Sequence, residues 1–180
     1  MTVCAGLIKN GKVFVGADSF WGCETYIDSN SDTGKLIKVG NSLVAIAGVA
    51  NLRDAAEEVN TDNLGRIISS KKDARDLAKD ILQKSKEMFE AGNSGCKGES
   101  IANGEMIIAT KTKLYRVQQD LSVFDCDKYV AIGAGEAYAT AILEFVTWKS
   151  PGPATLKYAL ETACQLSPFC QLPLDIREVK

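Results

Sequence analysis

The stretch TVCAGLIKNGKVFVGAD, from Thr2 to Asp18, decides how this chain folds. Its two short apolar runs flank Asn10-Gly11, a dipeptide that favours a tight two-residue hairpin turn. We therefore predict a buried antiparallel hairpin that begins with the first residues of the chain. Chain ends usually fray unless packing holds them, so this hairpin would fix Thr2 at the end of a strand within a sheet.

Downstream of the hairpin, the spacing of the apolar residues alternates between that of strands and that of helices. The predicted elements are a polar loop at 19–34, strands at 35–39 and 43–47, helices at 51–60 and about 71–91, a Gly-rich loop at 92–104, strands at 106–110, 113–117 and 130–133, helices at about 136–149 and 153–165, and a short strand near 169–172. Separate runs of strands and helix pairs favour an α+β layered domain. No linker or internal repeat divides the chain, so we expect residues 1–180 to form a single domain.

The composition is that of a globular protein and argues against several classes of partner. Hydrophobic residues make up 46% of the chain and the net charge is −2, so nothing favours a nucleic acid or an anionic membrane as partner. No apolar run approaches the roughly 20 residues that span a bilayer, and the N-terminus lacks the pattern of a secretory signal. The six cysteines show no CxxC spacing, so we expect reduced thiols and a cytoplasmic protein.

The absence of histidine from the sequence narrows the possible chemistry. Serine–histidine and cysteine–histidine catalysis are excluded, as are metal sites built on histidine. A zinc site made of cysteines alone has no supporting spacing, so we expect neither a metal nor a cofactor. If this protein is an enzyme, its base is a carboxylate, a lysine or an amine.

Thr2 directly follows the initiator Met1. If Met1 is removed, Thr2 carries both a hydroxyl and a free α-amine. An α-amine has an unperturbed pKa of about 8, which is low enough for it to act as a base toward the hydroxyl of the same residue near neutral pH. The sequence therefore offers an N-terminal hydroxyl nucleophile that needs neither histidine nor metal.

The order of elements, together with Thr2, Asp18 and Lys35, resembles the N-terminal nucleophile hydrolases, and within them the proteasome β-subunit and bacterial HslV branch. Asp18 follows Thr2 by sixteen positions within VGAD, and Lys35 opens KLIKV, where the family has its aspartate and lysine. The segment VAIAG ends at Gly48, and AIGAGEAYATAIL (residues 131–143) resembles the family's strand–glycine–helix segment. The resemblance covers almost the whole chain. It implies a four-layer αββα sandwich of two antiparallel sheets flanked by helix pairs.

The resemblance also implies a role for each matched residue. Thr2 would be the nucleophile, and the positive charge of Lys35 would lower the pKa of its hydroxyl. Asp18 would hold Lys35 in place, and the N–H of Gly48 would donate to the oxyanion. The expected substrate is a peptide or protein, within a ring of copies of this chain that works with an ATP-driven unfoldase, and no cofactor takes part.

Three positions depart from the family pattern. Ala134 and Pro168 stand where the family usually has serines, with Ser167 adjacent to the second, and Gln165 stands near the position of a family aspartate. Those family residues hydrogen-bond the N-terminal amine and tune its protonation. Two alternatives therefore stay open: a catalytically inactive shell or scaffold subunit that retains Met1, and an amidase that acts on small molecules.

Each motif taken alone also has a structural interpretation. Asp18 at a strand end is typical of a turn or cap residue, and Lys35 is typical of a solvated strand edge. The segment Gly133–Ala137 (GAGEA) could be misread as the GxGxxA of a dinucleotide site, but it lacks the preceding βαβ context and a clear acidic partner. Only the combination of Thr2, Asp18 and Lys35 favours the hydrolase.

Overall fold

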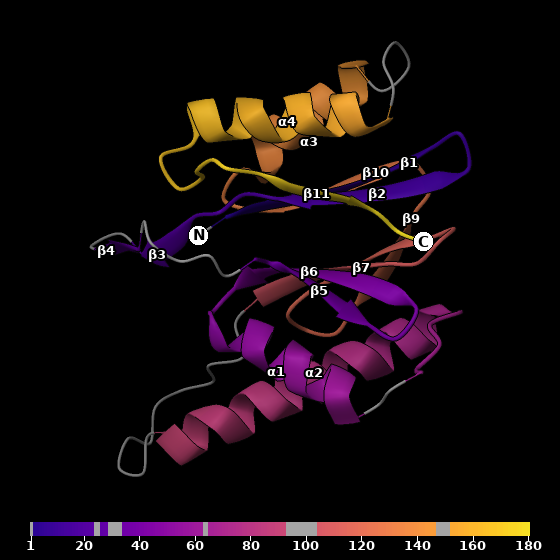
Figure 1. Cartoon of the computed structure of the whole chain (residues 1–180), viewed down its shortest axis with the longest axis vertical. Coiled ribbons are helices and arrows are strands. Elements are labelled where there is room, and N and C mark those ends of the chain that lie inside the picture. The colour runs from indigo at the N-terminus through magenta and orange to yellow at the C-terminus, as the bar shows by residue number, and fades with distance from the viewer. Residues whose placement is uncertain (1, 24–25, 29–33, 63–64, 93–103, 147–151) are drawn as a thin grey trace.

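Two antiparallel sheets lie face to face, and a pair of helices covers the outer side of each (Figure 1). The computed structural model describes residues 2–23, 26–28, 34–62, 65–92, 104–146 and 152–180. The predicted α+β sandwich with four αββα layers is confirmed. Within the described ranges, every helix is too short or too polar to span a bilayer.

The first sheet contains the N-terminal hairpin, and the second contains the middle of the chain. The first sheet has the order β10 (Tyr129–Gly133), β1 (Val3–Lys9), β2 (Lys12–Ala17), β11 (Asp175–Glu178). The second has the order β5 (Leu36–Val39), β6 (Ser42–Gly48), β7 (Gly104–Ala109), β8 (Leu114–Val117), β9 (Val123–Cys126). The helices are α1 (Asn51–Asp62) and α2 (Lys71–Gly92) on the second sheet, and α3 (Glu136–Val146) and α4 (Gly152–Leu166) on the first.

The N-terminal hairpin forms as its turn dipeptide predicts. Asn10 and Gly11 both have positive φ, at 53° and 71°, which matches the twist of the flanking strands. The register then pairs Lys9 with Lys12 and runs back to Cys4 opposite Ala17. Every side chain of β1 from Val3 to Leu7 is buried, so the start of the chain is held firmly between two layers.

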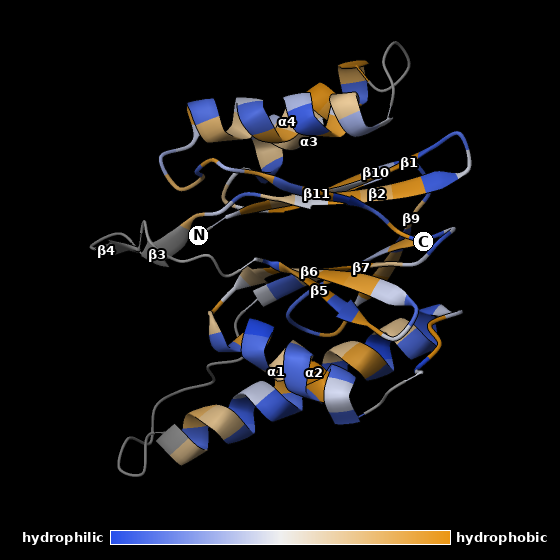
Figure 2. Cartoon of the chain, in the orientation of Figure 1, coloured by the Kyte–Doolittle hydropathy of each residue, from blue (hydrophilic) through white to orange (hydrophobic). Residues whose placement is uncertain are grey.

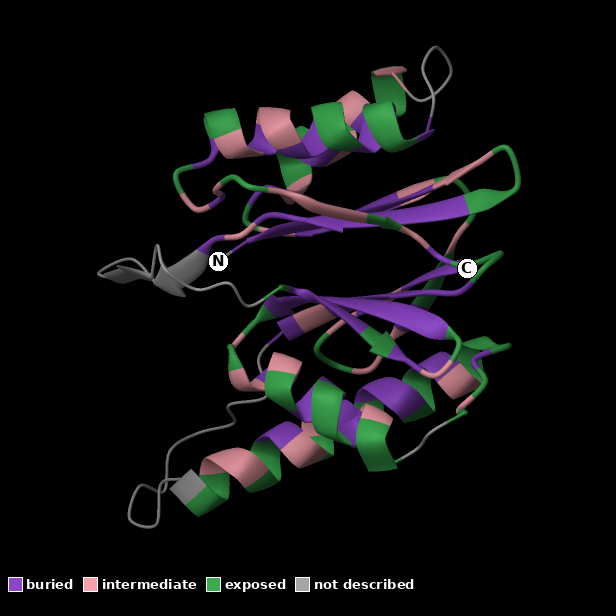
Figure 3. Ribbon diagram, viewed as in Figure 1, coloured by how far each residue is buried: buried purple, intermediate pink, exposed green. Residues whose placement is uncertain are grey.

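Buried hydrophobic residues form three clusters, and the ribbons coloured by hydropathy and by burial show such residues on the strands and on the helix faces next to the sheets (Figures 2 and 3). One cluster lies between the second sheet and helices α1 and α2, and another lies between the first sheet and helices α3 and α4. The third lies between the two sheets, where Cys4 and Ala17 of the first sheet meet Ala45 and Ala47 of the second. Small residues at this interface let the two sheets approach closely near the ends of β2 and β6.

Three predictions of secondary structure were wrong. The loop expected at 19–34 contains a two-stranded hairpin, β3 (Trp21–Cys23) and β4 (Tyr26–Asp28). Strand β9 was not predicted, and the C-terminal strand lies at 175–178 rather than near 169–172. Residues 93–103 of the expected Gly-rich loop and the last three residues of the helix predicted at 136–149 lie outside the described residues.

Candidate active site

Thr2, Asp18 and Lys35 meet at the ends of three strands that come from both sheets. Thr2 immediately precedes β1, Asp18 immediately follows β2, and Lys35 immediately precedes β5. The hairpin register brings Asp18 beside Val3, because Asp18 N donates to Val3 O at 3.1 Å and Val3 N donates to Asp18 Oδ1 at 3.0 Å. The structure thus brings together the three side chains that the sequence singled out, which we call the buried trio.

Asp18 is the acceptor at the centre of the trio. Its Oδ1 accepts hydrogen bonds from the Thr2 hydroxyl, from Val3 N and from Lys35 Nζ, the last at 2.7 Å. Its Oδ2 accepts from Phe20 N at 3.1 Å and from Gln171 N at 3.0 Å. Asp18 thus accepts five hydrogen bonds and forms a buried ion pair with Lys35.

Lys35 is the positively charged partner of the Thr2 hydroxyl. Its Nζ donates to Thr2 Oγ1 as well as to Asp18 Oδ1. Thr2 is 2% exposed, while Asp18 and Lys35 are each 3% exposed, so water screens these charges little. An ammonium in contact with a hydroxyl oxygen stabilises the alkoxide form of that oxygen, which makes Thr2 a candidate nucleophile.

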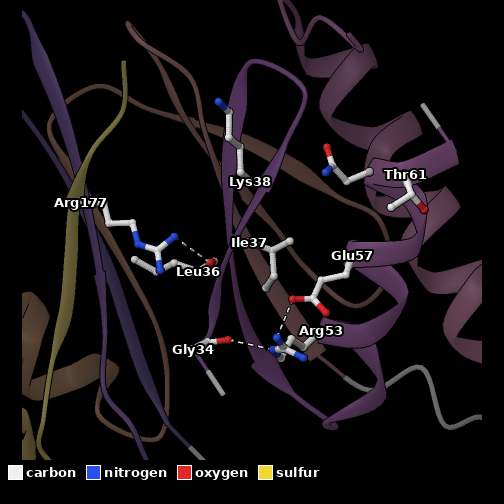
Figure 4. A pocket seen from close by; sticks show the side chains of 9 residues that line it. Gly34, Leu36, Ile37, Lys38, Arg53, Glu57, Thr61 and Arg177 are labelled. Atoms are coloured by element: carbon white, nitrogen blue, oxygen red, sulfur yellow. Dashed lines mark hydrogen bonds and ion pairs between the residues drawn. The ribbon is translucent and has the colours of Figure 1, made fainter. Parts of the chain in front are cut away.

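Two arginines hold the backbone on both sides of Lys35 (Figure 4). Arg53 Nε donates to Gly34 O at 3.0 Å, and Arg177 Nη1 donates to Leu36 O at 3.3 Å. The two arginines, Gly34 and Leu36 line a pocket of about 400 Å³ together with Ile37, Lys38, Glu57, Asn60 and Thr61. No pattern in the sequence points to either arginine, because each contact joins segments that are far apart in the chain.

Gly48 is the last residue of β6 and pairs with Gly104 of β7. The two sheets touch nearby, because Cys4 Sγ donates to Ile46 O at 3.5 Å. Cys4 lies two residues after Thr2, and Ile46 lies two residues before Gly48. The end of β6 therefore faces the start of β1, and Gly48 stays a candidate oxyanion donor.

Thiols near the trio are held in their neutral form. Burial raises the pKa of Cys4 from 9.0 to about 12, although the charge of Lys35 opposes the shift. Burial likewise raises the pKa of Cys164 to about 12. A thiol must ionise to act as a nucleophile, so neither cysteine competes with the Thr2 hydroxyl near neutral pH. Within the described part of the chain, no group of acidic or thiol side chains is arranged to hold a metal ion.

Comparison with known proteins identifies the fold. No family profile and no curated protein matches the sequence. BPH of Thiobacillus denitrificans superposes with a TM-score of 0.80 at 19% identity over 99% of this chain and 98% of that one. HslV of Trypanosoma brucei superposes with a TM-score of 0.69 at 16% identity over 98% of both chains. This chain has the N-terminal nucleophile hydrolase fold of the proteasome β-subunit and HslV.

Two further structures with this fold match the chain. BPH in complex with epoxomicin has a TM-score of 0.81 at 20% identity, and the match covers 99% of each chain. Anbu, an ancestral beta-subunit from Yersinia bercovieri, has a TM-score of 0.74 at 13% identity over 98% of this chain and 81% of that one. At identities of 13–20% these matches show the proteasome-like fold and nothing about the chemistry of the site.

Among the departures from the family pattern, Ala134 lies in a turn beside Thr2. Ala134 is exposed within the turn Gly133–Gly135, and Gly135 N donates to Thr2 O at 3.3 Å. Gly133 has a φ of +89°, and a Cβ built on it would lie 2.4 Å from Thr2 O, so this turn packs tightly against the Thr2 backbone. Ser167 is buried, and its hydroxyl accepts from Phe169 N at 3.3 Å. The turn beside Thr2 therefore offers a methyl group where the family usually offers a hydroxyl.

Proposed function

We propose that this chain is a threonine-type N-terminal nucleophile hydrolase that cleaves peptide bonds, with Thr2 as the nucleophile. One observation carries the proposal: the Thr2 hydroxyl lies between the Lys35 ammonium and the Asp18 carboxylate, and all three groups are buried. Such a cluster activates a hydroxyl that would otherwise be a poor nucleophile. Removal of Met1 would free the Thr2 nitrogen to serve as the base.

The first half of the reaction forms an ester on Thr2. The α-amine of Thr2 accepts the proton of its own hydroxyl, directly or through one water, while Oγ1 attacks the carbonyl carbon of the substrate. The hydroxyl donates to Asp18 Oδ1 in the resting arrangement, so its O–H bond must first turn toward the amine. Lys35 Nζ, held by Asp18 at 2.7 Å, stabilises the charge that develops on Oγ1.

The second half of the reaction releases the products. We assign the N–H of Gly48 as the donor to the oxyanion of the tetrahedral intermediate, a contribution of about 3–4 kcal/mol in comparable sites. The intermediate collapses as the C–N bond breaks, and the protonated α-amine of Thr2 gives its proton to the leaving amine. A water then gives a proton to the same α-amine and attacks the ester carbon. As the C–Oγ1 bond breaks, the α-amine returns that proton to Oγ1, which releases the acid product and restores the Thr2 hydroxyl.

We also propose that copies of this chain assemble into a ring and that the ring acts together with an ATP-dependent unfoldase. The likeness to HslV supports them, as do aromatic side chains exposed on the outer helices. Phe145 of α3 is 74% exposed and Tyr158 of α4 is 52% exposed, and large exposed apolar groups often mark contacts between subunits. The free thiols of Cys4 and Cys170 fit a reducing compartment such as the cytoplasm.

A non-catalytic scaffold is the second candidate function. It is favoured by Ala134, which supplies no hydroxyl in the turn that contacts the Thr2 backbone. While Met1 is attached, the Thr2 nitrogen is part of an amide and has no basic lone pair. The chemical state of residue 2 therefore separates the enzyme from the scaffold.

Intact-mass measurement combined with covalent labelling tests the proposal. We expect the purified protein to lack the mass of Met1 and to gain the mass of one epoxomicin, the ligand of a matched BPH structure. Thr2→Val is the matched control, because valine keeps the shape and permits Met1 removal but has no hydroxyl. Retained Met1 with no labelling and no peptide cleavage would overturn the enzyme and support the scaffold.

A further inference from the structure

Arg116 joins two carboxylates that come from different layers of the molecule. From β8 its Nη1 lies 2.7 Å from Glu136 Oε1 and its Nη2 lies 3.0 Å from Glu136 Oε2, which is a two-point contact. Its Nη2 also lies 3.0 and 3.1 Å from the two oxygens of Glu105 on β7. All three side chains are partly buried. We call these three residues the Arg116 network.

Each carboxylate of the network lies close to one part of the proposed active site. Glu105 pairs with Ala47, directly beside the pair of Gly104 with Gly48. Glu136 opens α3 immediately after the turn whose Gly135 N donates to Thr2 O. The network therefore links β7, which pairs with the end of β6 at Gly48, to the turn that supports Thr2.

Stability alone explains this arrangement poorly. Arg116 Nε is buried and has no hydrogen-bond partner among the described residues, and an unpartnered buried donor is destabilising. Burial lowers the pKa of Arg116, but the hydrogen bonds to Glu136 and Glu105 outweigh it and leave that pKa above its ordinary value. A permanently charged guanidinium with fixed donor directions is suited to holding two groups at a set separation.

We propose that Arg116 is a positioning residue that sets the separation between the Thr2 hydroxyl and the Gly48 amide. This inference rests on the proposed function. Thr2 immediately precedes β1 of the first sheet and Gly48 ends β6 of the second, so attack and oxyanion binding both depend on how the sheets meet at this edge. Oxyanion donors act at about 2.7–3.1 Å, and a misplacement of about 1 Å in an active site can lower the rate about 100-fold.

The expected effect of the network is on turnover rather than on substrate binding. Arg116→Met keeps an unbranched side chain and removes the guanidinium, and Arg116→Lys keeps the charge without the two-point geometry. We expect Arg116→Met to lower kcat about 10- to 100-fold with KM changed less than about threefold. Arg116→Lys should recover only part of the loss, because an ammonium cannot engage both oxygens of Glu136 in the same way.

The test compares these variants with Arg66→Lys in the assembled protein. Arg66 forms an ion pair with Asp80 at 2.5 Å outside the proposed site, so the kcat of the Arg66→Lys protein should stay within about twofold of the wild-type value. Hydrogen exchange is measured in parallel on peptides that contain Gly48 and Gly135. We expect faster exchange in both peptides for Arg116→Met and unchanged exchange for Arg66→Lys. If Arg116→Met does not fold, Glu136→Gln carries the same comparison.

Two results would overturn the inference. One is a folded Arg116→Met protein with kcat within about twofold of the wild type. The other is unchanged hydrogen exchange at both Gly48 and Gly135, which would show that the network does not hold these segments. A wild-type protein without turnover or epoxomicin labelling would overturn the proposed function instead, and the exchange data would then still decide whether Arg116 couples the two segments.

Discussion

Replacing Asp18 should lower the stability of the fold much more than replacing Lys35, the other charged member of the buried trio. Asp18→Ala leaves the N–H groups of Val3, Phe20 and Gln171 and the ammonium of Lys35 without their acceptor. Each buried donor left unpaired costs about 1–3 kcal/mol, and a broken buried ion pair costs about 3–5 kcal/mol. We expect Asp18→Ala to lower the free energy of unfolding by about 5 kcal/mol or more, which is most of the stability of a typical domain.

Lys35→Met should cost less, because Asp18 keeps four of its five donors. The remaining donors are the Thr2 hydroxyl and the same three backbone N–H groups. We therefore expect a loss of about 1–3 kcal/mol, below the usual cost of a broken buried pair. At about 2–4 °C per kcal/mol for a chain of this size, the melting temperature should fall by about 2–12 °C. Peptide cleavage should disappear, because Oγ1 loses its positive neighbour.

Urea unfolding and peptide cleavage, measured on the same samples, test this ordering. Lys12→Met is the control, because Lys12 pairs with Glu178 at 3.0 Å on the surface with its side chain 58% exposed. That pair should contribute no more than about 1 kcal/mol. A Lys35→Met protein less stable than Asp18→Ala would refute Asp18 as the centre of the cluster. Retained turnover in Lys35→Met would refute the role assigned to the ammonium.

Gly133→Ala should unfold or inactivate the protein, since φ at Gly133 is +89° and the new Cβ would lie 2.4 Å from Thr2 O. Gly11→Ala is the control, because Gly11 has φ +71° but nothing lies within 4 Å of the new Cβ. In urea unfolding, Gly11→Ala should lower the free energy of unfolding by only about 1–2 kcal/mol. Burial raises the pKa of Cys4 from 9.0 to about 12, so the neutral thiol is favoured in the fold. Its contribution to stability is complete below about pH 9 and is lost as the pH rises toward 12, and Cys4→Ala should flatten that decline in urea titrations. Arg53→Lys removes the Nε donor to Gly34 O, and we expect kcat to fall several-fold with the melting temperature nearly unchanged, as steady-state assays and a thermal melt can show.

The parts of the fold that were predictable are those in which local sequence and tertiary packing agree. Asn10-Gly11 specifies its turn whatever surrounds it, and Ser70 caps the start of α2 from within the local sequence, because Asp73 N donates to Ser70 Oγ at 3.2 Å. The missed strands are short and sit at edges. Strand β9 contains the 50% exposed Phe124, so its pattern does not alternate, and the sequence of β11 is the polar DIRE.

The sequence predicts the residues of the buried trio but not the arginines around it. Thr2 could be named as the hydroxyl residue that follows Met1, and Asp18 and Lys35 could be named because the chain resembles the N-terminal nucleophile hydrolases at these strand ends. Arg53 and Arg116 could not be named. Arg53 acts on a backbone carbonyl 19 residues away and Arg116 on a carboxylate 20 residues away, and such contacts arise only from the way the layers stack. An isolated arginine in a strand or helix looks like any other surface charge.

Within the trio, Lys35 discriminates between an enzyme and a scaffold better than Asp18 does. The Oδ2 atom of Asp18 binds the N–H groups of Phe20 and Gln171, so either kind of protein would need Asp18 in order to fold. A buried ammonium, in contrast, is costly to desolvate. A scaffold gains from Lys35 only the stability of about 1–3 kcal/mol expected above, whereas a nucleophile also gains a positive charge in contact with Oγ1. The position of Lys35 is therefore the reason to favour catalysis even though Met1 stands before Thr2 in the sequence.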